Sequence, residues 1–390
     1  MQPEPFPNHK ITKTRENLSR GVHFSAACYI NSAYIHPMPI RAQEALRAYA
    51  ESRSTPGVDL GHFDTSDPKI EFAALINAKP AEISYVPNTS TGENLIVNGL
   101  DIVGTNANVV TDALHFEGAL LHLGELKRRS QLDVRIVMPR DWHIYIKDLE
   151  RAVDAKTKLI EISLVAMDNG FQHDLKLVCD LAHTHGAYVY ADIAQAAGST
   201  PIDVRQSGVD FCACSSFKWL MGDFGLGFLF VREGLLDTVL RRTQYGYYEA
   251  KSLESHFLPT DKPGDAPYSW QLGDDASSHF EVGTQADGVA HVLAHSLPYI
   301  RAMGVENIQA HRQPLLRKLH EEMPRLGFDS ITPRESTSAI ISFRMKDRAD
   351  VVQRLQKFRI NARVTQQFLR LSPTVFNDIN DVDRVLEALS

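Results

Sequence analysis

The sequence has few cysteines, no surplus of positive charge and no motif typical of a metal site. Its four cysteines (Cys28, Cys179, Cys212 and Cys214) are scattered and form no CxxC pair, which argues against a disulfide scaffold and a zinc cluster. Lys and Arg total 41 against 48 Asp and Glu, so the net charge is −7 and no basic surplus favours nucleic acid or an anionic membrane. We expect no metal, nucleic-acid or membrane partner.

Long apolar runs are also missing. The first 20 residues are polar, without the apolar core of a signal peptide, and no later stretch approaches the ~18 apolar residues of a membrane-spanning helix. A cytoplasmic protein is therefore expected. Neither a Gly-x-Gly-x-x-Gly turn after the first strand nor a Walker phosphate loop is present, which weakens dinucleotide and nucleoside-triphosphate hypotheses.

Short apolar runs alternate with amphipathic stretches between residues 85 and 231. The runs, which predict strands buried on both faces, are Asn108–Thr111, Val134–Met138, Leu159–Val165, Ala187–Ala191, Phe211–Cys214 and Gly227–Val231. The stretches between them predict helices over Phe116–Arg129, Lys147–Ala155 and Leu175–His185. This alternation predicts an α/β fold with a mostly parallel sheet, whose ligands bind at the carboxyl ends of the strands.

The chain divides by pattern into an N-terminal arm (1–20), a large domain (21–296) and a smaller C-terminal α/β domain (297–390). Residues 244–280 are rich in aromatics and predict an ordered lid or a dimer contact. A long helical stretch is expected over 285–326. Beyond it we expect strands at 338–344, near 361–363 and at 368–371, with helices at 349–358 and 379–389.

A lysine between two aromatic residues follows one of the predicted strands. Desolvation between Phe217 and Trp219 would lower the pKa of Lys218 and make its amine a nucleophile; a surface lysine is the alternative. Ser215 and Lys218 also fit the Ser-x-x-Lys pattern of serine acylases, but the companion Lys-Thr-Gly and Ser-Asp-Asn motifs are missing.

Two further polar residues come at or just after strand ends. Asp192 closes an apolar strand, where a carboxylate needs a cation, and a pyridinium nitrogen could supply one; the alternative is a helix N-cap. His115 follows another strand and could stack on a flat cofactor or be a satisfied structural residue.

Hydroxyl groups and a glycine open a predicted helix in the segment 87–94, after the predicted strand 83–86. A helix N-terminus binds phosphate through its free N–H groups and its dipole. Ser90 and Glu93 also fit a capping box, and both interpretations can hold at once.

Together, these segments resemble the fold-type I pyridoxal-phosphate enzymes, in particular the class V aminotransferase and cysteine desulfurase-like family. Asp192-x-x-Gln195 and Ser215-x-x-Lys218 carry the resemblance, as does Phe280-Glu281-Val282-Gly283-Thr284, and it covers nearly the whole chain.

The resemblance implies roles for individual residues. Lys218 would form the Schiff base, Asp192 would keep the pyridine nitrogen protonated, and His115 would stack on the ring. The other implied contacts are Gln195 to the phenolic oxygen, Thr89, Ser90 and Ser215 to the phosphate, and Gly283 and Thr284 to the phosphate of a partner subunit in a homodimer. Arg370 would clamp the substrate carboxylate, with Arg363 as a second substrate contact; for both, a solvated strand residue is the alternative.

Departures from the family pattern bear on the reaction. No cysteine lies between Arg363 and Arg370, where desulfurases carry a catalytic one, and Phe217 and Met167 replace residues that are often His and Asn. We therefore expect an enzyme that acts on an amino acid through an external aldimine and an α-carbanion, as a carbon–sulfur or related lyase or an epimerase-like enzyme. A class V aminotransferase is the first alternative and a non-catalytic binding protein of the same fold is the second.

Overall fold

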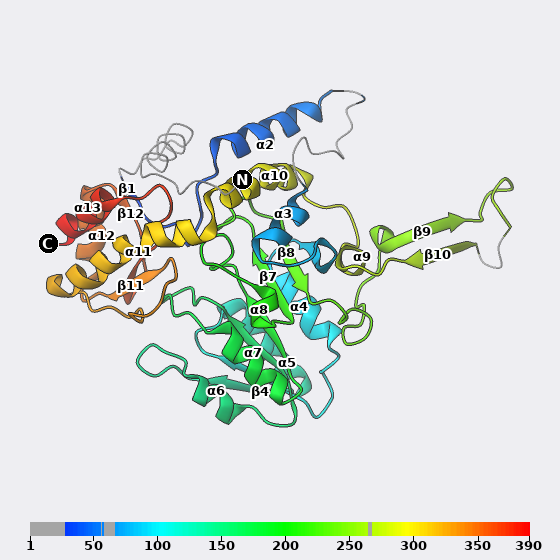
Figure 1. Ribbon diagram of the computed structural model, residues 1–390, viewed down its shortest axis with the longest axis horizontal. Helices are drawn as coiled ribbons and strands as arrows, with labels where there is room; N and C mark the ends of the chain where they lie inside the picture. Colours follow the sequence, from blue (N-terminus) through cyan, green and yellow to red (C-terminus); the bar gives the residue numbers. More distant parts are fainter. Residues whose placement is uncertain (1–27, 56, 58–66, 264–266) are drawn as a thin grey trace.

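A seven-stranded sheet forms the centre of the protein (Figure 1). The computed structural model describes residues 28–55, 57, 67–263 and 267–390, so the predicted arm 1–20 lies outside the described residues. The strand order is β2-β8-β7-β6-β5-β3-β4. The strand bounds are β2 Ile83–Val86, β3 Asn108–Asp112, β4 Asp133–Val137, β5 Thr157–Ser163, β6 Tyr188–Asp192, β7 Phe211–Ser215 and β8 Gly227–Val231.

Five neighbouring strands of this sheet run parallel, in the order β4, β3, β5, β6 and β7. Strand β8 runs antiparallel to both β7 and β2. Every residue of β2, β3, β7 and β8 is buried, which explains why these strands appear in the sequence as short, largely apolar runs. The predicted mostly parallel α/β fold is confirmed.

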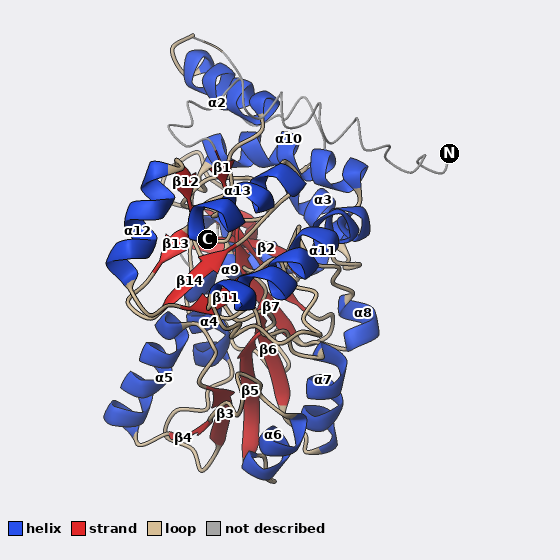
Figure 2. Cartoon of the chain, turned by 90° about the vertical axis from the view of Figure 1, so that its left-hand side faces the viewer, coloured by secondary structure: helices blue, strands red, loops and turns tan. Residues whose placement is uncertain are grey.

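Helices cover both faces of the sheet, and Figure 2 shows α5 on one side with α7 and α8 on the other. One apolar core lies under α4 and α5; the other lies under α3, α6, α7 and α10. The bounds are α2 Ile40–Ser52, α3 Pro68–Leu75, α4 Thr89–Gly99, α5 Glu117–Ser130, α6 Ile146–Ala152, α7 Leu175–Thr184, α8 Val204–Ser207, α9 Ala276–Phe280 and α10 Asp287–Met303, with 3-10 turns at Pro80–Glu82 (η1) and Tyr247–Glu249 (η2).

The C-terminal part has its own small sheet, of order β11-β14-β13, and its own apolar core. Its elements are α11 Val305–Glu322, η3 Met323–Leu326, β11 Ile341–Arg344, α12 Arg348–Lys357, β12 Ile360–Asn361, β13 Arg363–Val364, β14 Phe368–Leu371 and α13 Ile379–Leu389. The long helical stretch expected over 285–326 is present, and it consists of two α-helices and a 3-10 turn because Gly304 adopts a φ of 80° and separates α10 from α11.

The first described strand, β1 (Cys28–Tyr29), pairs in parallel with β12. Just after β1, Asn31 forms a β-bridge with Ser372, which follows β14 of the small sheet, and the Ala33 carbonyl oxygen accepts a hydrogen bond from Gln195 Nε2 (3.1 Å), which follows β6 of the central sheet. The segment before α2 therefore bridges the two sheets, which the sequence pattern does not reveal.

Residues 244–280 form an antiparallel hairpin of β9 (Ala250–Ser255) and β10 (Tyr268–Leu272), which projects from the body of the chain (Figure 1). An ordered lid or a dimer contact was expected here; the described residues form an ordered hairpin, and its role as a lid or dimer contact stays a prediction. Among the described residues, no helix is long and apolar enough to cross a membrane.

Candidate active site

The loop after β7 presents Lys218 at the carboxyl edge of the central sheet. Ser216 Oγ donates to the Leu226 carbonyl oxygen (2.6 Å), and Ser216 O accepts from Gly222 N (2.9 Å), which fixes a tight turn. Gly198, with a φ of +87°, packs so closely that a Cβ there would come within 2.5 Å of the Trp219 carbonyl oxygen. The lysine loop is therefore held firmly against the body of the protein.

Lys218 lies in a poorly hydrated environment. Its Nζ is 5.7 Å from the centre of the Phe217 ring. Desolvation lowers the pKa of Lys218 below its ordinary value; Asp192 opposes this shift and Arg370 adds to it. A lowered pKa raises the fraction of neutral amine, which is the nucleophilic form.

Asp192, at the end of β6, is a buried carboxylate. Its Oδ1 accepts a hydrogen bond from Ala194 N (2.8 Å), so it caps a turn rather than the helix considered above. Among the described residues, no side-chain cation is hydrogen-bonded to it. Burial raises the pKa of Asp192, and His115 and Lys218 partly offset the rise.

His115 lies beside Asp192 with both ring nitrogens engaged. Nδ1 is 2.9 Å from Ser163 Oγ and Nε2 is 3.3 Å from Glu161 Oε1. Burial lowers the pKa of His115, against the influence of Asp192, Asp112 and Glu93. The histidine is thus held in a fixed orientation by the protein, and its ring face is the surface left to contact a ligand.

The start of α4 meets the end of β7. Thr89 Oγ1 is 2.8 Å from Ser215 Oγ. The capping-box hypothesis for Ser90 and Glu93 is wrong, because Asn88 is the N-cap and accepts from Thr91 N (2.8 Å). Ser90 is exposed at the helix N-terminus, where free N–H groups favour an anion.

Two arginines face each other on adjacent strands of the small sheet. Arg370 on β14 is buried, donates through Nη1 to the Met167 carbonyl oxygen (2.8 Å) and has no hydrogen-bond partner at Nε. Arg363, directly opposite on β13, is exposed, with Cζ 5.7 Å from the centre of the Tyr34 ring. Burial lowers the pKa of Arg370 to about 10, although Asp168 raises it. Arg370 therefore keeps a buried donor that a carboxylate could satisfy.

Gln195 is fixed between two protein partners. Its Nε2 donates to the Ala33 carbonyl oxygen (3.1 Å) and its Oε1 accepts from Trp219 Nε1 (3.0 Å). Gln195 lies in the same region as the other candidate residues. A ligand that contacts it would share its side-chain amide with the Ala33 and Trp219 partners.

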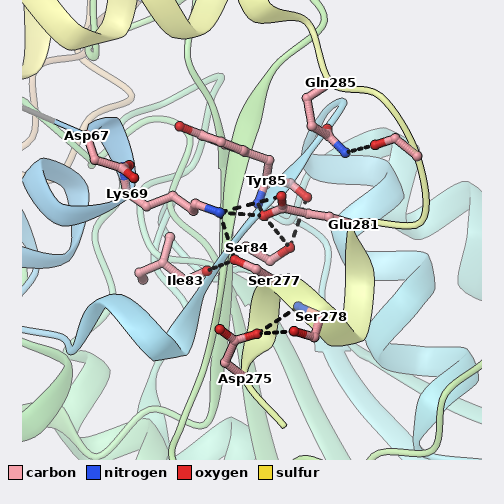
Figure 3. A network of polar contacts seen from close by, with 11 residues as sticks. Asp67, Lys69, Ile83, Ser84, Tyr85, Asp275, Ser277, Ser278, Glu281 and Gln285 are labelled. Carbon is pink, nitrogen blue, oxygen red and sulfur yellow. Dashed lines mark hydrogen bonds and ion pairs between the residues drawn. The ribbon is translucent and has the colours of Figure 1, made fainter. Parts of the chain in front are cut away.

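Gly283 and Thr284 are not brought to this group of residues. Figure 3 shows that Glu281, two residues earlier, is anchored to β2 and α3: its Oε1 accepts from Tyr85 N (2.9 Å) and lies 3.1 Å from Lys69 Nζ. Thr284 is exposed and Gly283 O accepts from Gln285 Nε2 (2.8 Å). The segment is held rigidly but faces outward.

The arrangement fits the cofactor implied by the resemblance. A buried Asp192 without a hydrogen-bonded cation suits a protonated ring nitrogen, and Lys218 lies near enough for the two pKa values to be coupled. The Thr89 and Ser215 hydroxyls at the start of α4 suit a phosphate group.

Three functional features are not apparent from the motifs alone. Glu161 is the one charged residue in the largely apolar run 159–165, which is a signal for a buried carboxylate. The proximity of the Glu93 and Glu161 carboxyls, and the contacts of Glu281 with Tyr85 and Lys69, join segments that are distant in the sequence. None of these three carboxylates is among the predicted site residues.

Comparisons with known proteins identify the family of the chain. The profile of the aminotransferase class-V family matches residues 65–385. An uncharacterized aminotransferase, YcbU, of Bacillus subtilis is 23% identical over 82% of this chain and 81% of its own length. A cysteine desulfurase of Escherichia coli is 27% identical, over 81% of this chain and 79% of its own.

Solved structures share the fold. An apo cysteine desulfurase of Thermococcus onnurineus superposes with a TM-score of 0.80 at 22% identity, covering 96% of both chains. The Escherichia coli cysteine desulfurase CsdA gives 0.82 at 18% identity, covering 99% of this chain and 98% of its own. The chain belongs to the class V aminotransferase family, and is a pyridoxal-phosphate-dependent enzyme of the lyase or transferase type.

Proposed function

We propose that the enzyme eliminates a sulfur-containing or related leaving group from an amino acid, or epimerises it, rather than forming a persulfide on a catalytic cysteine. The observation that carries this proposal is the state of the four cysteines, all of which are buried and outside any disulfide. Burial raises the pKa of the Cys179, Cys212 and Cys214 thiols, and no cysteine lies between Arg363 and Arg370. A reactive thiolate is thus not provided at the site.

The residues of the chain divide the work by position. Pyridoxal phosphate, when bound, supplies the electron sink for the electron pair released at the substrate α-carbon. Lys218 would hold it covalently and, once displaced by the substrate amine, take the α-proton at Nζ. Asp192 would keep the ring nitrogen protonated, and His115 would cover the ring face, held by Ser163 and Glu161.

Binding contacts lie on either side of this centre. Thr89, Ser90 and Ser215 would hold the phosphate at the start of α4. Arg370 would clamp the substrate carboxylate with its buried guanidinium, while the exposed Arg363 would be a second, weaker contact.

A homodimer would cover the hairpin. Apolar side chains on it are exposed, namely Leu253, Phe257, Leu258, Tyr268, Trp270 and Leu272. Its base is continuous with the outward-facing Gly283–Thr284 segment: a Cβ on Gly246 would come within 2.0 Å of the Val282 carbonyl oxygen, and Gln244 Nε2 donates to Phe280 O (3.1 Å). A second copy of the chain would bury this surface and could place Gly283 and Thr284 at its partner's phosphate.

Transamination is the second candidate, and the match to an uncharacterized aminotransferase favours it. Both reactions begin with the same residues and differ in the bond broken afterwards. The retained Lys218, Asp192 and Arg370 disfavour a non-catalytic binding protein. A cytoplasmic location remains part of the proposal and is supported by cysteines that form no disulfide.

The test is the visible spectrum of the purified protein with a panel of amino acids, with Lys218→Ala measured alongside. A yellow lysine-bound cofactor band is expected in the wild type and not in the variant. Release of pyruvate or ammonia would support elimination, loss of optical activity would support epimerisation, and conversion to the pyridoxamine form would overturn both in favour of transamination. A protein that takes up cofactor but converts no amino acid would favour the binding protein.

A further inference from the structure

A buried pair of carboxyl groups lies behind His115, and the reaction described above assigns neither of them a proton transfer. Glu161 on β5 is fully buried and Glu93 on α4 is 2% exposed. Among the described residues, neither carboxyl is bonded to a Lys or Arg; each has only a histidine as its ionisable partner of opposite charge. Two carboxylates in such a place cannot both be ionised at low cost, so a proton must be held there.

The contacts of this pair form a row from the surface to the site. On α5, the His122 side chain is 15% exposed, and its Nδ1 lies 2.7 Å from Glu93 Oε1. At the other end, Glu161 Oε1 lies 3.3 Å from His115 Nε2. Each member of the row can gain or lose a proton, so the row connects solvent to the histidine at the candidate cofactor face.

The middle of the row has one open position. Oε2 of Glu161 is buried without a hydrogen-bond partner, whereas both oxygens of Glu93 are engaged, by His122 and by Asn94 Nδ2 (2.7 Å). The two carboxyls lie near enough to shift each other's pKa, and burial raises the pKa of each to about 8. A protonated carboxyl is therefore present in the pair at neutral pH.

The other titratable groups around the pair do not offer a second route for protons between solvent and His115. They are Asp192 and Tyr190 on β6 and Asp112 at the end of β3. Asp112 is bonded to His173 (3.1 Å) and to Leu114 N (2.8 Å). Burial and the nearby carboxylates raise the pKa of Tyr190 well above its ordinary value, which keeps its hydroxyl neutral.

We propose that Glu93 and Glu161 relay protons between solvent at His122 and the His115 ring. When His115 Nε2 takes a proton, the Glu161 O–H bond breaks and an N–H bond forms; Glu93 then reprotonates Glu161, His122 reprotonates Glu93, and water reprotonates His122. The reverse sequence carries a proton out. Glu93 and Glu161 act through His115 and are positioning residues; their link to the reaction rests on the proposed function.

Infrared spectroscopy of the full chain tests the shared proton without turnover. The wild type at pH 7 should show the C=O band of a protonated carboxyl that shifts in D₂O, and Glu161→Gln should abolish it. Glu71→Gln is the matched control, since Glu71 is 5% exposed and ion-paired with Arg301 (2.6 Å), and should leave the band unchanged. A wild type without the band, or a band that survives Glu161→Gln, would overturn the proposal.

Exchange and activity test the connection to solvent. His122→Asn should keep the band but slow its exchange with D₂O roughly 10²-fold, the lower end of what a positioned acid or base contributes. In the loaded enzyme, Glu161→Gln should remove one limb of the pH profile of kcat with the visible spectrum unchanged, which a merely structural role would not do. Unchanged exchange in His122→Asn would disprove the relay. Failure to load the cofactor would count against the proposed function alone, because the infrared result stands by itself.

Discussion

At the carboxyl edge of the central sheet, charged side chains are buried, whereas on the β9–β10 hairpin apolar side chains are exposed. Asp192, Glu161 and Arg370 are at most 7% exposed, while Trp270 and Leu253 of the hairpin are at least half exposed. Burying a charge costs free energy unless a partner compensates, and exposing an apolar side chain forgoes the gain from its burial.

Each region therefore contains side chains whose environment is unfavourable in a single chain: buried charges at the sheet edge and exposed apolar groups on the hairpin. The buried residues at the sheet edge suit a small charged ligand. Such a ligand would carry a proton facing Asp192 and negative charge facing Arg370 and the start of α4. The exposed apolar side chains of the hairpin would be buried by the second copy of the chain in the proposed homodimer. The predictions below separate these two kinds of unfavourable environment.

The largest effect is expected at Asp192. Asp192→Asn removes the carboxylate that would hold the ring nitrogen proton and should lower kcat at least 10²-fold, as for the loss of other preorganised charges in active sites. Steady-state kinetics would measure it, with Asp154→Asn as a control because Asp154 belongs to a surface ion pair with Arg135. An Asp192→Asn enzyme of normal kcat would remove the sheet edge from the mechanism.

Much of this edge is foreseeable from the sequence. The runs that form β3, β6, β7 and β8 are short and apolar, so their ends, and with them Asp192 and Lys218, could be located to within a residue or two. Parallel strands bring such ends together whatever lies between them. The cap of α4 was misplaced because Asn88 and Ser90 are both residue types that favour the N-cap position, and only the structure shows that Asn88 caps the helix.

Other features depend on contacts that no local pattern carries. Glu93 and Glu161 are 68 positions apart, and β1 pairs with a strand at the far end of the chain. The sequence contains one local indication of the hairpin, the alternation of aromatic and polar residues over Tyr268–Leu272 in β10. The other strand of the hairpin, β9, is polar at most positions and gives no such indication. The break at Gly304 was similarly hidden within a continuous helical pattern.

Arg370 should give the next largest effect. Arg370→Ala should lower kcat/KM roughly 10²-fold, because a bidentate carboxylate clamp contains charge-assisted hydrogen bonds of about 1.5–3 kcal/mol each. Arg363→Ala, directly opposite but exposed, should cost less than about tenfold. Equal losses in the two variants would show that burial does not distinguish the two arginines.

The buried region should also make folding stability depend on pH. His36 is buried between the Pro37 carbonyl and the Thr374 hydroxyl, and desolvation lowers its pKa to about 4. Since the unfolded chain binds this proton near pH 6.5, stability should fall by about 3 kcal/mol between pH 6.5 and 4 from this residue. Urea unfolding should show a smaller pH dependence in His36→Gln than in His256→Gln, a substitution in the exposed hairpin. A pH dependence equal in both variants would contradict the assignment.

The smallest effect on the single chain is expected at the hairpin. Trp270→Ser should weaken self-association roughly 30-fold, about 2 kcal/mol for a buried aromatic at an interface, yet change the unfolding free energy of the chain by less than about 0.5 kcal/mol. Sedimentation equilibrium gives the first quantity and urea unfolding the second. Leu121→Ser, on the exposed face of α5, is the control and should alter neither. A wild type that stays monomeric at micromolar concentration would contradict the proposed dimer contact at the hairpin.

The pairing of β1 with β12 has a consequence for biosynthesis. Asn31 contacts Asn361 across 330 positions of the chain, and Ala33 contacts Gln195 at the site. At translation rates of about 5–20 residues per second, the N-terminal strand waits roughly 15 to 70 s before its partner is made. During that interval its strand edge is open to other chains. The late-made strand β12 thus completes the position of the early-made segment 28–33, and with it the wall of the candidate site beside Gln195.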